Sequence, residues 1–261
     1  MTILDELKKF FKNIMYWVFS FLGFSILFFS FGLKNVVLFG KNLILPLPAE
    51  NSFSVIIFNK IQTDLLPPNV HLVVTDFLSG FTAQIILSLL LAFIITFPFL
   101  LYRVIKYLSP ALFEHEKKAI LKAILPSSFL FFIGCAFAYY FVIPMTFKIL
   151  FPYATIISAT PFFSVDQFIS SIVSLMFAVG IMFLLPLLMI LLSFLGIVDG
   201  AFWQNKWRHM LLFFTILTAI ITPDGTGVTM IILLVPMVLL YSIGCIFTNK
   251  FKKVELIELT K

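Results

Sequence analysis

Long runs of apolar residues, separated by short polar breaks, fill most of this chain. A bilayer core of about 30 Å is crossed by about 20 helical residues, so runs of this length predict membrane-spanning helices. Runs such as 85–101 and 175–192 lack the alternation of apolar and polar positions that a transmembrane β-barrel requires. The pattern therefore predicts an all-α polytopic membrane protein. We expect six spans, at residues 14–33, 82–101, 120–145, 166–195, 210–222 and 228–247.

The polar breaks and prolines refine this picture. The connection 34–81 contains four prolines, which favour irregular or short-helix structure, with a short amphipathic helix expected at 54–61. Pro186 falls inside the fourth span and predicts a kink. The fifth run, 210–222, is shorter than a normal span, which predicts a buried or shortened helix. No internal repeat or soluble domain is visible, so we expect residues 1–261 to form a single integral-membrane domain.

The composition excludes a soluble globular protein. Hydrophobic residues make up 61% of the chain and charged residues 11%, with a mean hydropathy of +1.12. An ordinary soluble domain is about 45–50% apolar and about 25% charged. The two cysteines, Cys135 and Cys245, lie in separate apolar runs, so the sequence predicts neither a disulfide framework nor a metal-binding or redox pair.

The positive charges indicate an orientation in the membrane. The net charge of +6 comes from residues in the polar breaks, so we read it as a membrane signal and expect no nucleic-acid partner. If both termini lie on one side, the opposite side carries few basic residues, namely Lys34, Lys41, Lys60 and Lys148. The positive-inside rule then places both termini in the cytoplasm. We expect a bacterial or archaeal plasma membrane, with an organelle inner membrane left open.

Ionisable residues are absent from the middle of the expected spans. Pumps and ion-coupled transporters usually keep such groups there, and a metal site, proton relay or catalytic base would also need them. We therefore expect no enzymatic activity, no metal and no cofactor. A small-solute transporter or channel stays open as the alternative, although the sequence has no internal repeat to support it. Gln84 is a polar residue within a span that helix packing would explain.

Carboxylates and aromatic residues gather near the membrane on the expected cytoplasmic side. These include Glu6, Tyr107 and Glu116, with Pro110 between the last two. A carboxylate there can hold an arginine guanidinium through two parallel hydrogen bonds, a geometry that lysine cannot reproduce. The alternative is that Glu114 and Glu116 pair with the lysines that follow them on a solvated helix face.

These residues belong to a motif that resembles a known family. Residues 107–118 read Tyr-Leu-Ser-Pro-Ala-Leu-Phe-Glu-His-Glu-Lys-Lys, which resembles the cytoplasmic-loop signature of TatC, the core subunit of the twin-arginine protein translocase. Residues 4–8, Leu-Asp-Glu-Leu-Lys, resemble the amino-terminal motif of that family. Further resemblances follow in the same order at 46–47, 137–144 and 221–241, so they extend over nearly the whole chain.

The resemblance implies a signal-peptide receptor. Proteins of this family bind signal peptides with two adjacent arginines on folded cargo. With TatA-type and/or TatB-type single-span partners, they export that cargo across the membrane by using the proton-motive force. The resemblance also implies a concave, glove-like arrangement of six helices whose fifth and sixth members are short. It further implies a homo-oligomer within the translocase.

Carried over by position, the family motifs assign roles on the cytoplasmic side. Glu116 would be the main carboxylate for a signal-peptide arginine, and Tyr107 and Pro110 would shape the loop around it. Glu6 would be a second contact. Lys8 stands where the family has an arginine, which keeps the charge but loses the two-pronged geometry.

Other positions carry over less completely. Pro46 and Asp224 would be functional positions on the external side, where they would shape a loop and a turn. Leu184 and Ser242 stand where many family members have a glutamate, so polar anchors thought to face partner helices are missing. We expect Leu184 and Gln84 to contact partner helices.

Overall fold

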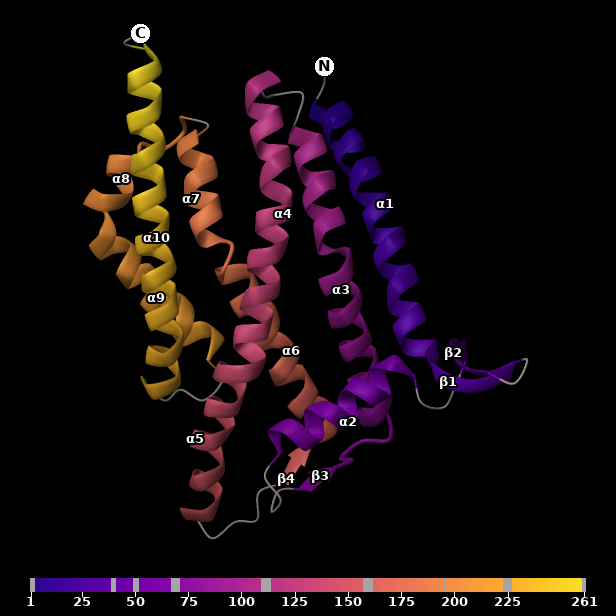
Figure 1. The fold of residues 1–261 in the computed structure, drawn as a ribbon. Coiled ribbons are helices and arrows are strands. Elements are labelled where there is room, and N and C mark those ends of the chain that lie inside the picture. The colour runs from indigo at the N-terminus through magenta and orange to yellow at the C-terminus, as the bar shows by residue number, and fades with distance from the viewer. Residues whose placement is uncertain are drawn as a thin grey trace. The chain divides into compact units, whose positions relative to one another are not determined.

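The structure is a computed structural model of the chain that consists mainly of helices (Figure 1). It describes residues 3–38, 41–48, 52–66, 71–108, 114–156, 162–194, 196–222 and 227–259. For residues 3–9, 33–38, 41–48, 71, 108, 114–120, 122, 150–156, 162–163 and 249–259 it describes the backbone alone. The helices are α1 (Ile3–Ser30), α2 (Phe53–Leu65), α3 (Ser79–Leu108), α4 (Glu114–Phe137), the π-helix η2 (Ala138–Val142), α5 (Ile143–Ile156), α6 (Val165–Met182), α7 (Leu185–Phe194), α8 (Gly200–Asn205), α9 (Trp207–Ile221) and α10 (Gly227–Leu259).

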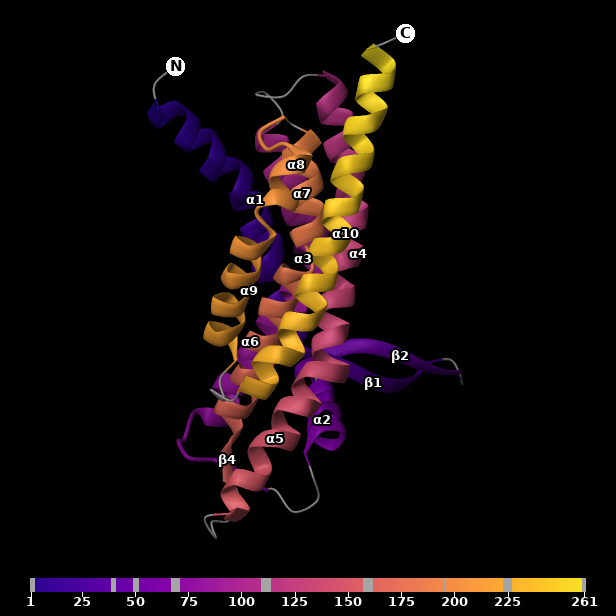
Figure 2. The same ribbon diagram turned by 90° about the vertical axis from the view of Figure 1, so that its left-hand side faces the viewer.

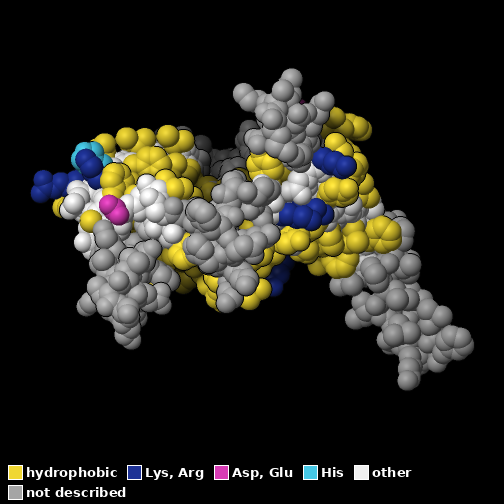
Figure 3. Space-filling model, turned by 90° about the horizontal axis from the view of Figure 1, so that it is seen from above, with side chains coloured by type: hydrophobic (Ala, Val, Ile, Leu, Met, Phe, Trp, Pro, Cys, Tyr) yellow, Lys and Arg dark blue, Asp and Glu magenta, His cyan; other side chains and the backbone are white. Residues whose placement is uncertain are grey.

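Most of these helices are suited to a bilayer. Within the described residues, five helical stretches are long and apolar enough to cross a membrane: Phe10–Ser30, Ser79–Tyr107, Ala123–Ile149, Val165–Phe194 and Gly227–Thr248. Apolar side chains cover most of the described surface in the end-on view of Figure 3. The expected all-α polytopic membrane class is therefore confirmed.

The last two helices differ from each other in length. Helix α9 has 15 residues, which gives about 22 Å at 1.5 Å per residue and falls short of a bilayer core of about 30 Å. This agrees with the short fifth helix that the sequence predicts. The sixth helix is longer than the family resemblance implies, because the apolar part of α10 covers 22 residues, Gly227–Thr248. Beyond it the helix continues to Leu259 through Lys, Glu and Leu, which all favour helices.

The chain divides into two compact units. The first contains Met1–Tyr107 and Phe147–Val173, and the second contains Leu108–Thr146 and Ser174–Lys261. Helices α5 and α6 each begin in one unit and end in the other. The single domain expected from the sequence stays a prediction.

In the first unit, α1 ends in a β-hairpin where the sequence predicts irregular structure. Strands β1 (Phe31–Leu38) and β2 (Lys41–Pro48) are antiparallel, with Phe31 opposite Pro48 (Figure 2). The helix thus stops at Ser30, before the expected end of the first span at residue 33, and Gly32 in the new strand is a weak helix former. The prolines in β2 are tolerated because each strand of a two-stranded ribbon keeps one free edge. The expected short helix is present as α2.

A second, smaller pairing closes the far end of this unit. Strands β3 (His71–Val73) and β4 (Phe162–Ser164) run parallel, although they lie about ninety positions apart in the chain. The hydroxyls of Thr75 and Ser164 are 2.8 Å apart beside this pair, and Ser164 also donates a hydrogen bond to Asp166. These contacts connect the start of α6 to the segment that leads into α3.

Two prolines within apolar runs have different effects on the helices that contain them. Pro186 lacks the N–H that would bond to the carbonyl of Met182. The helix is interrupted there between α6 and α7, at the position where the sequence predicts a kink. Pro144 does not end its helix, although the expected third span stops at residue 145. The π-turn η2 precedes it, and the N–H of Ile143 bonds to the carbonyl of Ala138. This wider turn lets the helix pass the proline and continue to Ile156.

The core of the second unit is built around close helix contacts. One cluster joins η2, α6 and α10 through residues that include Val142, Val179 and Leu233, each about 1% exposed. Helices α4 and α6 pass close to each other at Gly134 and Gly180. A Cβ atom on Gly134 would lie 2.9 Å from the Cα atom of Gly180. Only glycine allows the two backbones to approach this closely, a common device in membrane helix packing.

The glycine contact yields a stability prediction. Gly134→Ala should lower the free energy of unfolding by about 1–3 kcal/mol, because the added methyl group meets the backbone of Gly180 and cannot be accommodated by a side-chain rotation. Thermal unfolding of the purified protein in detergent measures the effect. The matched control is Gly23→Ala in α1, where an added Cβ meets nothing within 4 Å. Equal melting temperatures for the two variants would contradict the close contact.

Candidate functional site

The candidate receptor site begins where α1 and α3 pack together in the first unit. These helices run antiparallel, so the start of α1 lies beside the end of α3 (Figure 1). The rings of Phe10 and Tyr107 meet edge to face there, with centroids 4.8 Å apart and an interplanar angle of 62°. Tyr107, one of the predicted loop-shaping residues, is half-buried in this contact. The ring pair therefore fixes the end of α3 against the amino-terminal helix.

The other predicted cytoplasmic residues are located only in part. Glu6 and Lys8 belong to α1, with Glu6 one helical turn before Phe10, and Glu116 lies in the first turn of α4. Their side chains are outside the described part of the structure, as is the whole of Pro110. The structure thus brings the helix that carries Glu6 and Lys8 to Tyr107, and the placement of Glu116 relative to them stays a prediction.

The predicted external positions are also only partly described. Pro46 lies in β2, where it pairs with Leu33 of β1. Asp224 falls outside the described residues. The shaping role expected for both positions therefore stays a prediction.

Next to the ring pair lies a cationic cluster that the sequence analysis missed. The guanidinium of Arg103 lies 4.7 Å from the ring centroid of Tyr16 and 4.7 Å from that of Phe99. Asn13 donates a hydrogen bond of 2.6 Å from Nδ2 to the backbone carbonyl of Arg103. A sequence signal existed, since Phe99 precedes Arg103 by four positions and so shares its helix face.

Gln84 has a structural role within the first unit. Its Nε2 donates hydrogen bonds to the hydroxyl of Ser52, at 2.7 Å, and to the backbone carbonyl of Phe29, at 3.3 Å. The hydroxyl of Ser52 is in turn 2.9 Å from that of Ser54 at the start of α2. Gln84 thereby connects α3 to α1 and α2. The partner contact expected of Gln84 stays a prediction.

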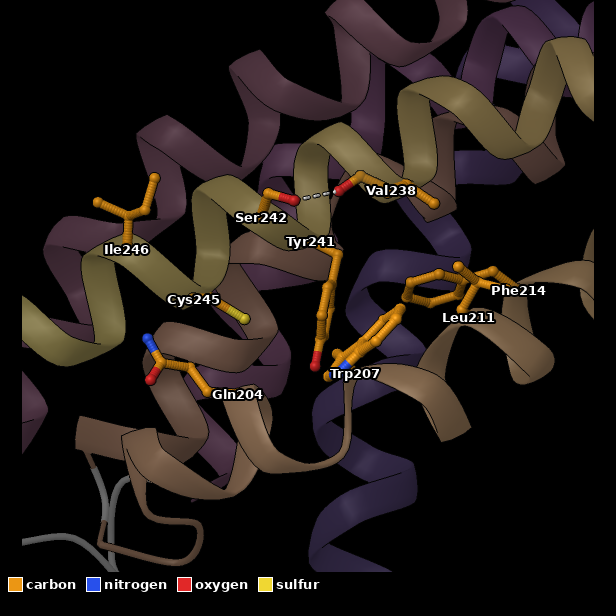
Figure 4. Close-up of a pocket in the computed structure, with 9 residues that line it drawn as sticks. All are labelled: Gln204, Trp207, Leu211, Phe214, Val238, Tyr241, Ser242, Cys245 and Ile246. Atoms are coloured by element: carbon orange, nitrogen blue, oxygen red, sulfur yellow. Dashed lines mark hydrogen bonds between the residues drawn. The ribbon is translucent and has the colours of Figure 1, made fainter.

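The second unit contains a largely apolar pocket of about 370 Å³. Figure 4 shows its two walls, one from α10 and one from α8 and α9. Ser242 lines the pocket from α10, and its hydroxyl donates a hydrogen bond of 2.8 Å to the carbonyl of Val238. The lining consists of Gln204, Trp207, Leu211, Phe214, Val238, Tyr241, Ser242, Cys245 and Ile246.

Hydrogen bonds between helices hold the α10 wall in place. The phenol of Tyr241 donates to the backbone carbonyl of Trp203 in α8. The indole Nε1 of Trp203 donates to the hydroxyl of Ser193 in α7, at 3.0 Å. These bonds join α7, α8 and α10 behind the pocket. They satisfy polar groups that would be costly to leave unpaired in an apolar environment.

Leu184, the other expected partner-contact residue, lies in the break between α6 and α7. It is half-buried, and its backbone N–H bonds to the carbonyl of Ile181 at 3.0 Å. It does not line the pocket between α8, α9 and α10. Over the described residues, no three His, Cys, Asp or Glu side chains gather closely enough to hold a metal ion.

Comparisons with known proteins identify the family. The model of the family described as Sec-independent protein translocase protein (TatC) matches residues 2–236. The TatC protein of Cenarchaeum symbiosum (strain A) is 33% identical over 227 residues, which cover 87% of this chain and 86% of that protein. The TatC protein of Aquifex aeolicus (strain VF5) is 33% identical over 193 residues, 72% of this chain and 80% of that protein.

A solved structure agrees with this result. A crystal structure of the twin-arginine translocase receptor TatC in DDM matches with a TM-score of 0.74 and 28% sequence identity, over 93% of this chain and 99% of that chain. Sequence and fold thus point to the same family over almost the full length. The chain belongs to the TatC family of Sec-independent protein translocase proteins.

Proposed function

We propose that this protein is the signal-peptide receptor and core subunit of a twin-arginine translocase, which exports folded proteins by using the proton-motive force. The observation that carries the proposal is the family match over residues 2–236, together with a solved relative described as the twin-arginine translocase receptor. The protein would act in a plasma membrane with both termini in the cytoplasm, the orientation favoured by its basic residues. It would form a homo-oligomer within the translocase.

Recognition would depend on carboxylates at the membrane surface. Glu116 would accept two parallel hydrogen bonds from one arginine of the signal peptide, and Glu6 would provide a second contact. The packing of Tyr107 on Phe10 supports this arrangement. It holds the end of α3 against Phe10 of α1, and Glu6 lies one helical turn before Phe10 in the same helix. Pro110 would limit the freedom of the loop before Glu116. Lys8 would tune the local charge, and the apolar part of the signal peptide would lie on the apolar helix surface.

The carboxylate role can be tested by Glu116→Gln. This change keeps the shape of the side chain but removes the charge that pairs with arginine, and a charge-assisted pair contributes about 1.5–3 kcal/mol. We expect export of a twin-arginine reporter protein to fall at least about tenfold, with normal membrane insertion. The matched control is Glu114→Gln, two positions away on the same helix, which should export normally.

Photocrosslinking provides the direct measurement. A photoreactive aromatic residue at position 107, which leaves Glu116 in place, should crosslink in membranes to a signal peptide with two arginines and not to the same peptide with two lysines. Normal export by Glu116→Gln, or equal crosslinking to both peptides, would argue against the assigned recognition site.

The partners would be single-span membrane proteins of the TatA and/or TatB type. We propose that one of them places apolar side chains in the pocket between α8, α9 and α10. Ser242 supports this choice, because it lines the pocket and stands where the sequence resemblance places a glutamate facing partner helices. The pocket rim also keeps apolar side chains exposed, among them Trp207 and Ile246 at 51% and 67%. The expected contacts at Leu184 and Gln84 stay part of this proposal.

Filling the pocket tests the partner proposal. Ser242→Phe should reduce copurification of a TatA-type or TatB-type partner about tenfold, because the new ring occupies the space that the partner would use. Signal-peptide crosslinking at position 107 should be unchanged. The matched control is Ile243→Phe, the next residue of α10, which is 45% exposed and outside the pocket lining. Equal partner recovery from both variants would refute the proposed contact.

A further inference from the structure

The Arg103 cluster in the first unit is not used by the function proposed above. Arg103 lies in α3 two residues beyond the expected span 82–101 and four residues before Tyr107, near the end of the long apolar stretch Ser79–Tyr107. It therefore lies where the expected span meets the membrane surface. At this depth a basic side chain lies near the phosphate groups of the lipid headgroups. The position of Arg103 therefore raises the question of which negative group it meets.

Three side chains of the cluster contact the guanidinium. The rings of Tyr16 and Phe99 both lie 4.7 Å from its central carbon, one from α1 and one from α3. Asn13 bonds to the backbone carbonyl of the same residue at 2.6 Å and accepts a longer contact of 3.4 Å from Nη1. The aromatic contacts and Asn13 limit the freedom of the side chain. This restriction reduces the entropy that binding of a ligand would cost.

Among the described residues, Asn13 is the one side chain to which this guanidinium donates a hydrogen bond. Its Nε is buried without a hydrogen-bond partner, and across the described part of the chain no acidic side chain forms an ion pair with Arg103. One turn further along α1, the indole Nε1 of Trp17 is also buried without a partner. Among the described side chains of α1 and α3, two buried donors thus lack an acceptor, which favours a ligand that brings acceptor oxygens and negative charge.

We propose that Arg103, with Asn13, Tyr16 and Phe99, forms a binding site for the phosphate of an anionic phospholipid. The planar guanidinium matches the spacing of phosphate oxygens, and the rings of Tyr16 and Phe99 both lie against it. A signal-peptide arginine does not fit this site, because a second guanidinium would be repelled. The inference depends on the contacts within the first unit and is independent of the proposed receptor function.

The alternative is a purely structural role for this arginine. Arg103 lies near the carboxyl end of α3, where a cation interacts favourably with the helix dipole, and Asn13 clamps it to α1. In that case its removal would destabilise the protein equally in every lipid. A lipid site instead predicts a loss of lipid retention that is much larger for anionic than for zwitterionic lipid.

The experiment is native mass spectrometry of the purified full-length protein with added lipid. The probes are phosphatidylglycerol, phosphatidylcholine and inorganic phosphate. We expect the wild type to retain phosphatidylglycerol more strongly than phosphatidylcholine. Arg103→Gln should weaken the retention of phosphatidylglycerol about tenfold. The retention of phosphatidylcholine should fall much less, because its choline cation offsets the charge of its phosphate.

The matched control is Arg208→Gln. Arg208 also lies over an aromatic ring, that of Trp207 at 5.5 Å, but it is exposed. The control removes the same net charge, so it should bind phosphatidylglycerol like the wild type. Arg103→Lys keeps the charge and should give an intermediate affinity, because an ammonium group lacks the planar fork. If Arg103→Gln does not fold, the retention of phosphatidylglycerol by Arg103→Lys is compared with that of Arg208→Gln instead.

Four results would overturn the proposal. The first is unchanged retention of phosphatidylglycerol in Arg103→Gln. The second is an equal loss for both lipids with a lower melting temperature in lipid-free detergent, which would assign Arg103 a structural role. The third is binding of inorganic phosphate as tight as that of phosphatidylglycerol, which would exclude lipid as the specific ligand. The fourth is displacement of the lipid by a twin-arginine peptide, which would place the site in the receptor surface.

Discussion

The need to satisfy backbone polar groups without water governs this structure. In an apolar environment each unpaired N–H or C=O costs several kcal/mol, so the chain must keep its hydrogen bonds within its own helices. The treatment of Pro144 illustrates this constraint, since a π-turn precedes it and the helix continues to Ile156. Side chains follow the same rule. Tyr241 and Trp203 bond to groups on neighbouring helices, and the hydroxyls of Thr96 and Thr146 bond to carbonyls one turn earlier in their own helices.

The sequence predicts the helices well because their signal is strong and local. An apolar run of about 20 residues is rarely anything except a membrane span, so the class of the protein, the break at Pro186 and the short α9 follow from the sequence. The hairpin β1–β2 does not follow, because its prolines indicate irregular structure and its pairing depends on contacts between residues as distant as Phe31 and Pro48. The extension of the third span beyond Pro144 depends on a π-turn, for which the sequence offers no clear signal.

The candidate site shows the same division between local and long-range information. The motif around Tyr107 and Glu116 is visible in the sequence because the family resemblance marks it. The contact between Tyr107 and Phe10 requires two helices to pack in one register, and only the structure provides this. In the sequence, Arg103 is one of several basic residues near the end of a span. The structure shows that Asn13 and Tyr16 of α1 contact it. The pocket beside Ser242 likewise combines three helices.

The two prolines of β2 have a consequence for how this protein avoids unwanted association. Pro46 and Pro48 are two positions apart, so their nitrogens face the same edge of the strand. That edge must be the outer one, because a proline nitrogen cannot donate to the partner strand. The outer edge of β2 therefore lacks donors at two successive outward positions, and an incoming strand finds no continuous ladder there. An exposed two-stranded ribbon can otherwise act as a template for aggregation between copies. In this chain, the missing proline donors make one of its two edges a poor partner for another strand.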